Sequence, residues 1–430
     1  MTSIRSQRVV LPDGVRPAAI EFASVIRRIT GFDQIEGAVD YGDLVIMPGV
    51  VDSHVHVNEP GRTEWEGFTS ATRAAAAGGT TTIVDMPLNS IPATTTLEAL
   101  RIKKRALEGQ CFVDVALWGG VIPGNLGELR PMLEEGARGF KCFLVHSGVD
   151  DFPNVSPGEL RAAARELAPT GAPLLVHAEL PAPIDRAARK VAGADQQSYG
   201  TYLDSRPRAA EDEAIALLRD VCAETGAWIH IVHLSSASAV AIVKDAQSAG
   251  LRLTAETTPH YLHFDAETIP AGRNEFKCAP PIRERANREQ LWQGLADDTI
   301  EMIVSDHSPC TPELKRGTFL TAWGGIASVQ FVLPVIWTEA RQRGFELTDL
   351  ARWLCGRTAR LARLSRKGAI EPGRDADFAI WSPEETFRVD DSVIQHRHKV
   401  TPYKGETLYG VVKETWVRGA LAGASRGTLL

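Results

Sequence analysis

Two histidines separated by one residue, His54 and His56, end an apolar run that begins at Val45. Alternate side chains of a β-strand share one face, so both imidazoles point the same way and can bind one metal ion. This spacing also occurs on solvent-exposed strands that bind nothing, so the pair alone indicates little. It gains weight because four further polar residues stand at the ends of later β-like runs: Lys141, His177, His233 and Asp306. The pattern predicts a metal-dependent hydrolase.

Each of these residues also has a structural interpretation. A single histidine at a strand end is more often a hydrogen-bonded structural residue than a metal ligand. His230 is an example, because its odd offset from His233 places its side chain on the other face of the strand. Asp306 could equally cap a following helix. Only the six residues together therefore indicate a metal centre.

Lys141 is unusual because it lies within an apolar run, residues 139–144. Burial of an ammonium group is costly, and three arrangements would relieve that cost. A salt bridge could neutralise the charge, or a lowered pKa could remove it. Reaction with CO₂ would instead convert the amine to a carbamate anion, which can bridge two cations.

Composition limits the classes of function. The chain has 430 residues, 44% of them hydrophobic, and a formal net charge of −7 without a basic block. Neither nucleic acid nor an anionic membrane is expected as a partner. No apolar stretch approaches the ~18 residues of a membrane span, and the N-terminus lacks the pattern of a signal peptide. Six cysteines without a Cys-x-x-Cys pair indicate reduced thiols, so we expect a cytoplasmic protein.

The middle of the chain alternates short β-like runs with Ala-, Leu-, Glu- and Arg-rich helical stretches. Eight nearly continuous apolar runs favour parallel strands that are buried on both faces. We place them at residues 50–56, 80–86, 112–118, 139–144, 173–177, 228–234, 252–258 and 300–306. A doubly wound sheet is the alternative. An α/β fold of the (β/α)₈ TIM-barrel type is preferred, because polar residues follow many different strands, where barrel enzymes place their sites.

The two ends of the chain do not follow this alternation. Residues 1–48 and 371–430 contain short β-like runs instead, and we expect them to pair into one small β-sandwich-like domain. The predicted hydrolase barrel then spans residues 49–370.

The six residues together resemble the metal site of the amidohydrolase superfamily, and in particular its cyclic amidohydrolases. The resemblance covers nearly the whole chain, including residues 373–377 at the return into the small domain. It implies that His54 and His56 bind one metal ion and that His177 and His233 bind a second. It further implies that carboxylated Lys141 bridges the two ions, while Asp306 completes the first site and acts in catalysis. These ligands suit Zn²⁺, Co²⁺, Mn²⁺ or Fe²⁺, with Zn²⁺ preferred.

Two branches of this group fit less well. Dihydroorotases carry Arg where this chain has Asn58, Asn where it has Ala279 and His where it has Cys310. Without that guanidinium group the site loses a bidentate partner for a carboxylate, so binding of an anionic substrate is disfavoured. Hydantoinases and dihydropyrimidinases typically carry Tyr five residues after the bridging lysine, where this chain has His146.

Five stretches are instead similar to the allantoinases: residues 58–67, 86–90, 139–150, 276–283 and 306–315. The resemblance implies hydrolysis of the hydantoin ring of allantoin, a small neutral ureide, to allantoate in purine catabolism. It also suggests a homo-oligomer, for which we expect a tetramer. Asn89, His146, Ser147 and His260 are candidates for polar substrate contacts, although Asn89 and His260 could equally be structural.

Two other interpretations remain open. A hydantoinase or dihydropyrimidinase would use the same chemistry with a different side-chain pocket. A catalytically inactive barrel that acts as a scaffold is less favoured, because such proteins commonly lose metal ligands and all six candidates are present here. We also expect Trp323 to serve packing and not substrate stacking.

Overall fold

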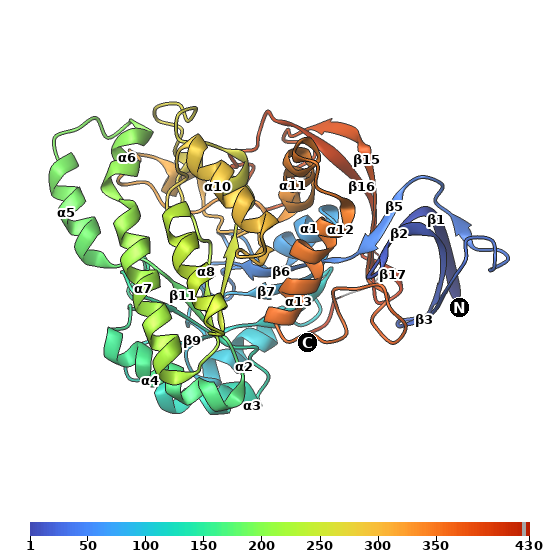
Figure 1. Cartoon of the computed structure of the whole chain (residues 1–430), viewed down its shortest axis with the longest axis horizontal. Coiled ribbons are helices and arrows are strands. Elements are labelled where there is room, and N and C mark those ends of the chain that lie inside the picture. The colour runs from blue at the N-terminus through green and yellow to red at the C-terminus, as the bar shows by residue number, and fades with distance from the viewer. Residues whose placement is uncertain (424–426) are drawn as a thin grey trace.

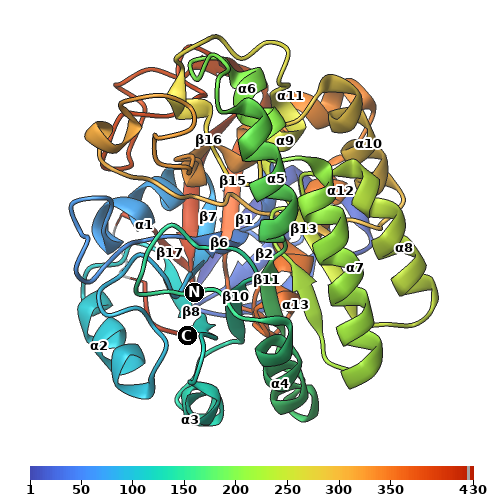
Figure 2. The same cartoon turned by 90° about the vertical axis from the view of Figure 1, so that its left-hand side faces the viewer.

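The computed structural model describes residues 1–423 and 427–430 of the chain. Its centre is a barrel of parallel strands surrounded by helices, and a sheet formed by both ends of the chain lies beside it (Figures 1 and 2). The barrel strands are β6 (Val50–Val55), β7 (Thr80–Asp85), β8 (Asp114–Leu117) with its short continuation β9 (Gly119–Gly120), β10 (Phe140–Phe143), β11 (Leu174–His177), β12 (Ile229–Ile231), β13 (Leu253–Thr257) and β14 (Met302–Ile303).

Each barrel strand pairs in parallel with the next, and the ring closes between its first and last members. Two stretches of ladder, β6-β7-β8 and β9 to β14, account for most of the ring. A parallel bridge between Val55 and His307 joins β6 to the segment after β14, and the His56 N–H donates to the His307 carbonyl at 2.8 Å. This closure confirms the predicted TIM barrel and excludes the open doubly wound sheet.

The helices cover the outside of the barrel and follow the predicted alternation. Their starts match local signals: the Thr96 hydroxyl accepts from the Ala99 N–H, and Ser156 forms a capping box with Glu159. The helices are α1 (Phe68–Ala77), α2 (Leu97–Leu107), α3 (Leu129–Glu134), α4 (Pro157–Leu167), α5 (Pro181–Val191), α6 (Tyr199–Ser205), α7 (Arg208–Thr225), α8 (Val240–Ser248), α9 (Pro259–His263), α10 (Arg285–Ala296), α11 (Val332–Ala340), α12 (Leu347–Ala351) and α13 (Arg357–Leu361). In the described part of the chain, no helix is both long and apolar enough to span a membrane.

Both ends of the chain form one eight-stranded sheet, as the sequence predicts. Antiparallel pairing of β5 with β15 joins the N-terminal strands to the C-terminal ones, which lie next to the barrel helices in Figure 1. The sheet covers its own apolar core, which includes Ile20, Phe22 and Phe378. Its strands are β1 (Thr2–Leu11), β2 (Gly14–Phe22), β3 (Ile26–Thr30), β4 (Val39–Asp40), β5 (Val45–Pro48), β15 (Phe378–Arg388), β16 (Thr407–Val417) and β17 (Ala420–Leu421). The exact domain boundaries at 48/49 and 370/371 stay a prediction.

A buried ion cluster connects the barrel to this sheet. The Lys367 ammonium lies 2.6 Å from Asp114 at the start of β8, 2.7 Å from Asp377 just before β15 and 3.0 Å from Asp375. The three carboxylates are spaced closely enough for a metal ion, but Lys367 already supplies a shared positive charge, and Arg366 and Arg418 pair with Asp375 and Asp114. Buried charges are stable only when they are paired, so this cluster depends on Lys367.

We predict that Lys367→Met lowers the free energy of unfolding by about 3–5 kcal/mol, because it leaves three buried carboxylates without their shared cation. Chemical denaturation followed by tryptophan fluorescence measures the change. Lys244→Met is the matched control, since Lys244 forms an exposed pair with Asp297 that should contribute less than about 1 kcal/mol. Equal shifts in the two variants would contradict the prediction.

Candidate metal centre

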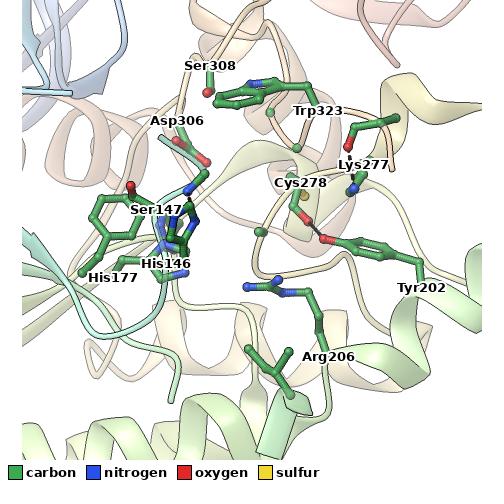
Figure 3. Close-up of a pocket in the computed structure, with 18 of the residues that line it drawn as sticks. His146, Ser147, His177, Tyr202, Arg206, Lys277, Cys278, Asp306, Ser308 and Trp323 are labelled. Carbon is green, nitrogen blue, oxygen red and sulfur yellow. Dashed lines mark hydrogen bonds between the residues drawn. The ribbon is translucent and has the colours of Figure 1, made fainter. Parts of the chain in front are cut away.

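The barrel strands and the segments that follow them place the six predicted residues around one cavity of about 560 Å³, with Lys141 inside β10 and the other five at or just beyond the strand ends. Figure 3 shows part of its lining, with His177 and Asp306 on one side and Arg206 opposite them. All six side chains are almost completely buried within the protein. The barrel thus brings together residues that are up to 252 positions apart in the sequence. The lining members of the predicted centre are His54, His56, Lys141, His177, His233 and Asp306.

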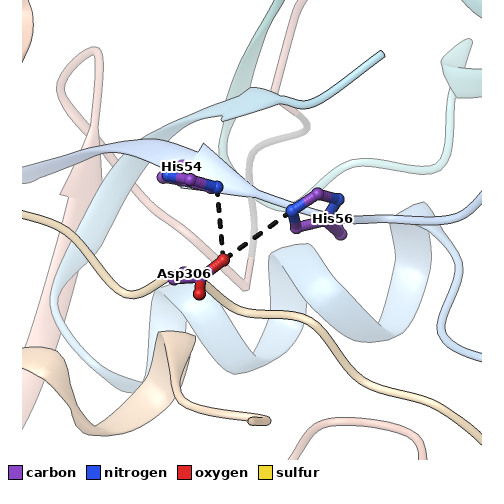
Figure 4. Close-up of side chains that lie close together, drawn as sticks. All are labelled: His54, His56 and Asp306. Carbon is purple, nitrogen blue, oxygen red and sulfur yellow. Dashed lines mark ion pairs between the residues drawn. The ribbon is translucent and has the colours of Figure 1, made fainter. Parts of the chain in front are cut away.

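The first half of the centre is formed by β6 and the segment after β14. An Asp306 Oδ1 atom lies 3.2 Å from His54 Nε2 and 3.7 Å from His56 Nε2 (Figure 4). The ligand atoms of these three residues all lie within 4.8 Å of one another, which is close enough to hold one ion.

Glu256, on β13, orients the first of these histidines. Its carboxylate lies 2.5 Å from His54 Nδ1 and 3.1 Å from His230 Nε2. Burial alone would raise the pKa of Glu256, but the two histidines lower it to about 2. The anionic Glu256 therefore accepts a hydrogen bond from the Nδ1–H group of His54, which leaves the Nε2 lone pair directed toward Asp306. His230 faces Glu256 and Thr254 and does not line the cavity, in agreement with the predicted orientation.

The second half of the centre lies on β11 and just after β12. The rings of His177 and His233 are 4.6 Å apart, and that of His233 is 5.4 Å from that of His54. His177 Nε2 lies 2.7 Å from Glu179, whose pKa Arg206 and His177 hold well below its usual value despite burial. The remaining ring nitrogen of His177, Nδ1, is therefore the one free to bind a metal ion.

Lys141 lies between the two halves and has no carboxylate partner. Its ammonium is 5.0 Å from the centre of the Phe143 ring, and no ion pair with it occurs among residues 1–423 and 427–430. Burial lowers the pKa of Lys141 and raises that of Asp306. Of the three arrangements open to a buried lysine, no salt bridge is present among the described residues, which leaves a lowered pKa or a carbamate.

The donor set fits divalent metal ions. Burial lowers the pKa of His54 to about 4 and also lowers the pKa values of His56, His177 and His233, so all four imidazoles are neutral at pH 7. Neutral imidazole is the form that binds metal. His54 Nε2 is buried without a hydrogen-bond partner, which is costly unless a ligand completes it. Bound cations would also favour the anionic form of Asp306.

Two of the candidate ligands have strained backbones. His233 has φ of 37° and Asp306 has φ of 44°, in the left-handed region that non-glycine residues rarely adopt. Such conformations persist when surrounding contacts enforce them, and they concentrate at functional sites. Here each turn directs a side chain back into the cavity at the end of its strand.

The predicted substrate contacts fall into two groups. Asn89, His146 and Ser147 line the cavity, whereas His260 is completely buried in α9 outside its lining. The buried Asn89 Oδ1 has no hydrogen-bond partner. His146 is 62% exposed, and the Ser147 hydroxyl is already bonded to the carbonyls of Val149 and Phe152.

Several cavity residues were not predicted from the sequence. Arg206 and Lys277 line the cavity, and Trp323 does so while its ring packs 4.9 Å from that of Trp65. The packing role expected for Trp323 therefore describes only one of its contacts. Glu179 and Glu256 are fully buried carboxylates next to the histidines. The signal that was available is an acidic residue inside an apolar strand or two positions after a candidate ligand.

Comparison with known sequences agrees with this geometry. The sequence model of the amidohydrolase family matches residues 45–422. The chain belongs to the amidohydrolase family. This amidohydrolase is 52% identical to an allantoinase from Streptomyces avermitilis, over 97% of this chain and 94% of that protein. It is 41% identical to an allantoinase from Saccharomyces cerevisiae, over the same shares of the two chains.

Among solved structures, the L-hydantoinase (dihydropyrimidinase) of Arthrobacter aurescens is similar to the amidohydrolase described here. It superposes with a TM-score of 0.92 and 31% sequence identity, over 100% of this chain and 98% of that one. The shared fold extends over both the barrel and the terminal sheet.

We predict that Glu256→Gln weakens metal binding by about 10–100-fold, because the amide no longer fixes the tautomer of His54. Competition with a chromogenic chelator measures the affinity. Glu385→Gln serves as the control, since Glu385 pairs with Lys413 on the surface, far along the terminal sheet. Unchanged affinity in Glu256→Gln would contradict the assigned role of this carboxylate.

Proposed function

We propose that this protein is an allantoinase, which hydrolyses the hydantoin ring amide of allantoin to allantoate in purine catabolism. The observation that carries the proposal is 40–52% identity over 87–97% of the chain to proteins named as allantoinases or probable allantoinases. The six polar residues at the rim of one barrel provide the donor set that ring opening requires. Identity to the structurally similar L-hydantoinase is lower, at 31%.

The proposed centre takes two divalent ions. His54, His56 and Asp306 would hold one, and His177 and His233 the other, with Lys141 between them. When bound, the two ions would supply a hydroxide nucleophile at neutral pH and polarise the ring carbonyl. Zn²⁺ is our preferred ion, and Co²⁺, Mn²⁺ and Fe²⁺ suit the same ligands.

Asp306 is placed to move the proton in this reaction. Its carboxylate lies in the segment after β14, 3.2 Å from His54 Nε2, and lines the cavity. In the anionic form it would accept the proton of the attacking water and then deliver it to the departing ring nitrogen. The surrounding burial limits competing water and keeps His54 neutral, and Glu256 orients the His54 ring.

Lys141 is proposed to be carboxylated. A neutral amine can attack CO₂, forming a C–N bond and releasing one proton as the carbamate anion appears. Burial lowers the pKa of Lys141, which favours the neutral amine. The anion would then be paired with two cations, which removes the cost of a buried charge.

The remaining proposals concern the setting of the enzyme. Asn89, His146 and Ser147, which line the cavity, are proposed as substrate contacts, and the predicted contact to His260 is less favoured because His260 is buried outside the lining. We also propose a homotetramer in the cytoplasm. Size-exclusion chromatography with light scattering would determine the oligomeric state.

We predict that protein loaded with Zn²⁺, Co²⁺ or Mn²⁺ in bicarbonate buffer converts racemic allantoin to allantoate. Asp306→Asn should lower kcat by at least about 10³-fold, because it removes both a ligand and the proton acceptor. Allantoate formation is measured by a coupled colorimetric assay, with hydantoin and dihydroorotate as parallel substrates. Turnover of hydantoin without allantoin would instead assign the protein to the hydantoinases.

Carboxylation of Lys141 has a spectroscopic signature. After incubation with ¹³C-bicarbonate and metal, the wild type should give a carbamate carbon signal in ¹³C NMR, and Lys141→Met should not. Lys103→Met is the control, since Lys103 is equally buried but paired with Asp85 at 2.6 Å. A wild-type spectrum without the signal would contradict the carbamate.

A further inference from the structure

Arg206 is a buried cation that reaches the cavity opposite the metal ligands. It follows the last residue of α6 and lines the cavity, with only 20% of its side chain exposed. Figure 3 shows its guanidinium group directed into the open space. A buried guanidinium group requires a partner, and the partner of Arg206 is Glu179. Glu179 uses only part of the hydrogen-bonding capacity of Arg206.

Glu179 holds the guanidinium in a fixed orientation. Arg206 Nε donates to Glu179 Oε1 at 3.1 Å, and Nη2 donates to Oε2. The two parallel bonds form a fork that fixes the plane of the group. The third nitrogen, Nη1, makes no hydrogen bond to any of residues 1–423 or 427–430 and is left for a ligand.

The surroundings of Arg206 single it out as the available donor at this end of the cavity. Nearby α5 contributes the apolar residues Ile184, Ala188 and Val191 to the lining. Lys277 Nζ already donates to the carbonyls of Leu320 and Ala322.

We propose that Arg206 is the specificity-determining residue for the ureido arm of the substrate, donating from Nη1 to the ureido carbonyl oxygen. This inference rests on the proposed allantoinase function. Allantoin is a hydantoin ring with an added ureido group, so once the ring amide occupies the metal side, the arm must extend across the cavity. A urea carbonyl is a strong neutral acceptor, and a charged donor held in place by a second residue binds it with little loss of entropy.

A second role for Arg206 gives different consequences. Glu179 also contacts His177, so Arg206 could act only by positioning a metal ligand. In that case its loss would reduce metal binding and would affect every substrate to the same extent. A contact to the ureido arm would affect allantoin alone.

The test compares Arg206→Lys and Arg206→Gln with wild type, using metal content, KM and kcat for allantoin, and binding of hydantoin as a substrate or competitive inhibitor. Arg206→Lys keeps a cation for Glu179 but loses the Nη1 donor. Arg186→Gln on α5 is the control, because Arg186 is 58% exposed and lies 3.7 Å from Glu213, which is also exposed.

We expect Arg206→Lys to retain the wild-type metal content while KM for allantoin rises about 10–100-fold, as for loss of a charged hydrogen bond. The KM of hydantoin as a substrate, or its inhibition constant as a competitive inhibitor, should change less than about threefold. Unchanged KM for allantoin, equal weakening of hydantoin, or loss of one metal ion with the activity would each overturn the inference. Wild-type protein that does not hydrolyse allantoin would instead refute the proposed function, independently of Arg206.

Discussion

The structure of the site depends on one backbone contact, the pairing that closes the barrel. Val55 and His307 form a parallel bridge next to the hydrogen bond from His56 to His307. Because His54 and His56 lie on one side of this seam and Asp306 on the other, closure alone brings a carboxylate within 3.2 Å of an imidazole 252 positions away. Without this closing contact, His54 and His56 would lie at one edge of an open sheet and Asp306 at the other.

Closure of the barrel also buries several ionisable side chains next to one another. It gathers four imidazoles, an amine and a carboxylate in a space with little water, where charged forms are unfavourable. Burial keeps the histidines neutral, while the carboxylates of Glu256 and Glu179 orient His54 and His177 through hydrogen bonds. The histidines remain neutral, their free nitrogens face inward, and strained turns at His233 and Asp306 complete the arrangement. This arrangement supports the proposed metal centre.

Much of this organisation could be predicted from the sequence. Alternating apolar runs indicated the eight strands and their order, because strand period and length are local properties of the chain. The six residues at strand ends followed from the rule that parallel strands present their carboxyl ends at one rim. Glu256 and Arg206 could not be found in this way. Glu256 is marked only as an acidic residue inside an apolar strand, and the pattern does not show which histidine it faces. Arg206 is held at the cavity by Glu179, a contact between residues 27 positions apart that no strand-end rule predicts.

The central claim is that the six residues at the barrel rim hold two metal ions. Anomalous diffraction from crystals of metal-loaded protein, recorded on both sides of the metal absorption edge, tests it most directly. We predict two peaks, one beside His54, His56 and Asp306 and the other beside His177 and His233, with density extending from Lys141 between them. A single peak, or peaks outside this rim, would contradict the account.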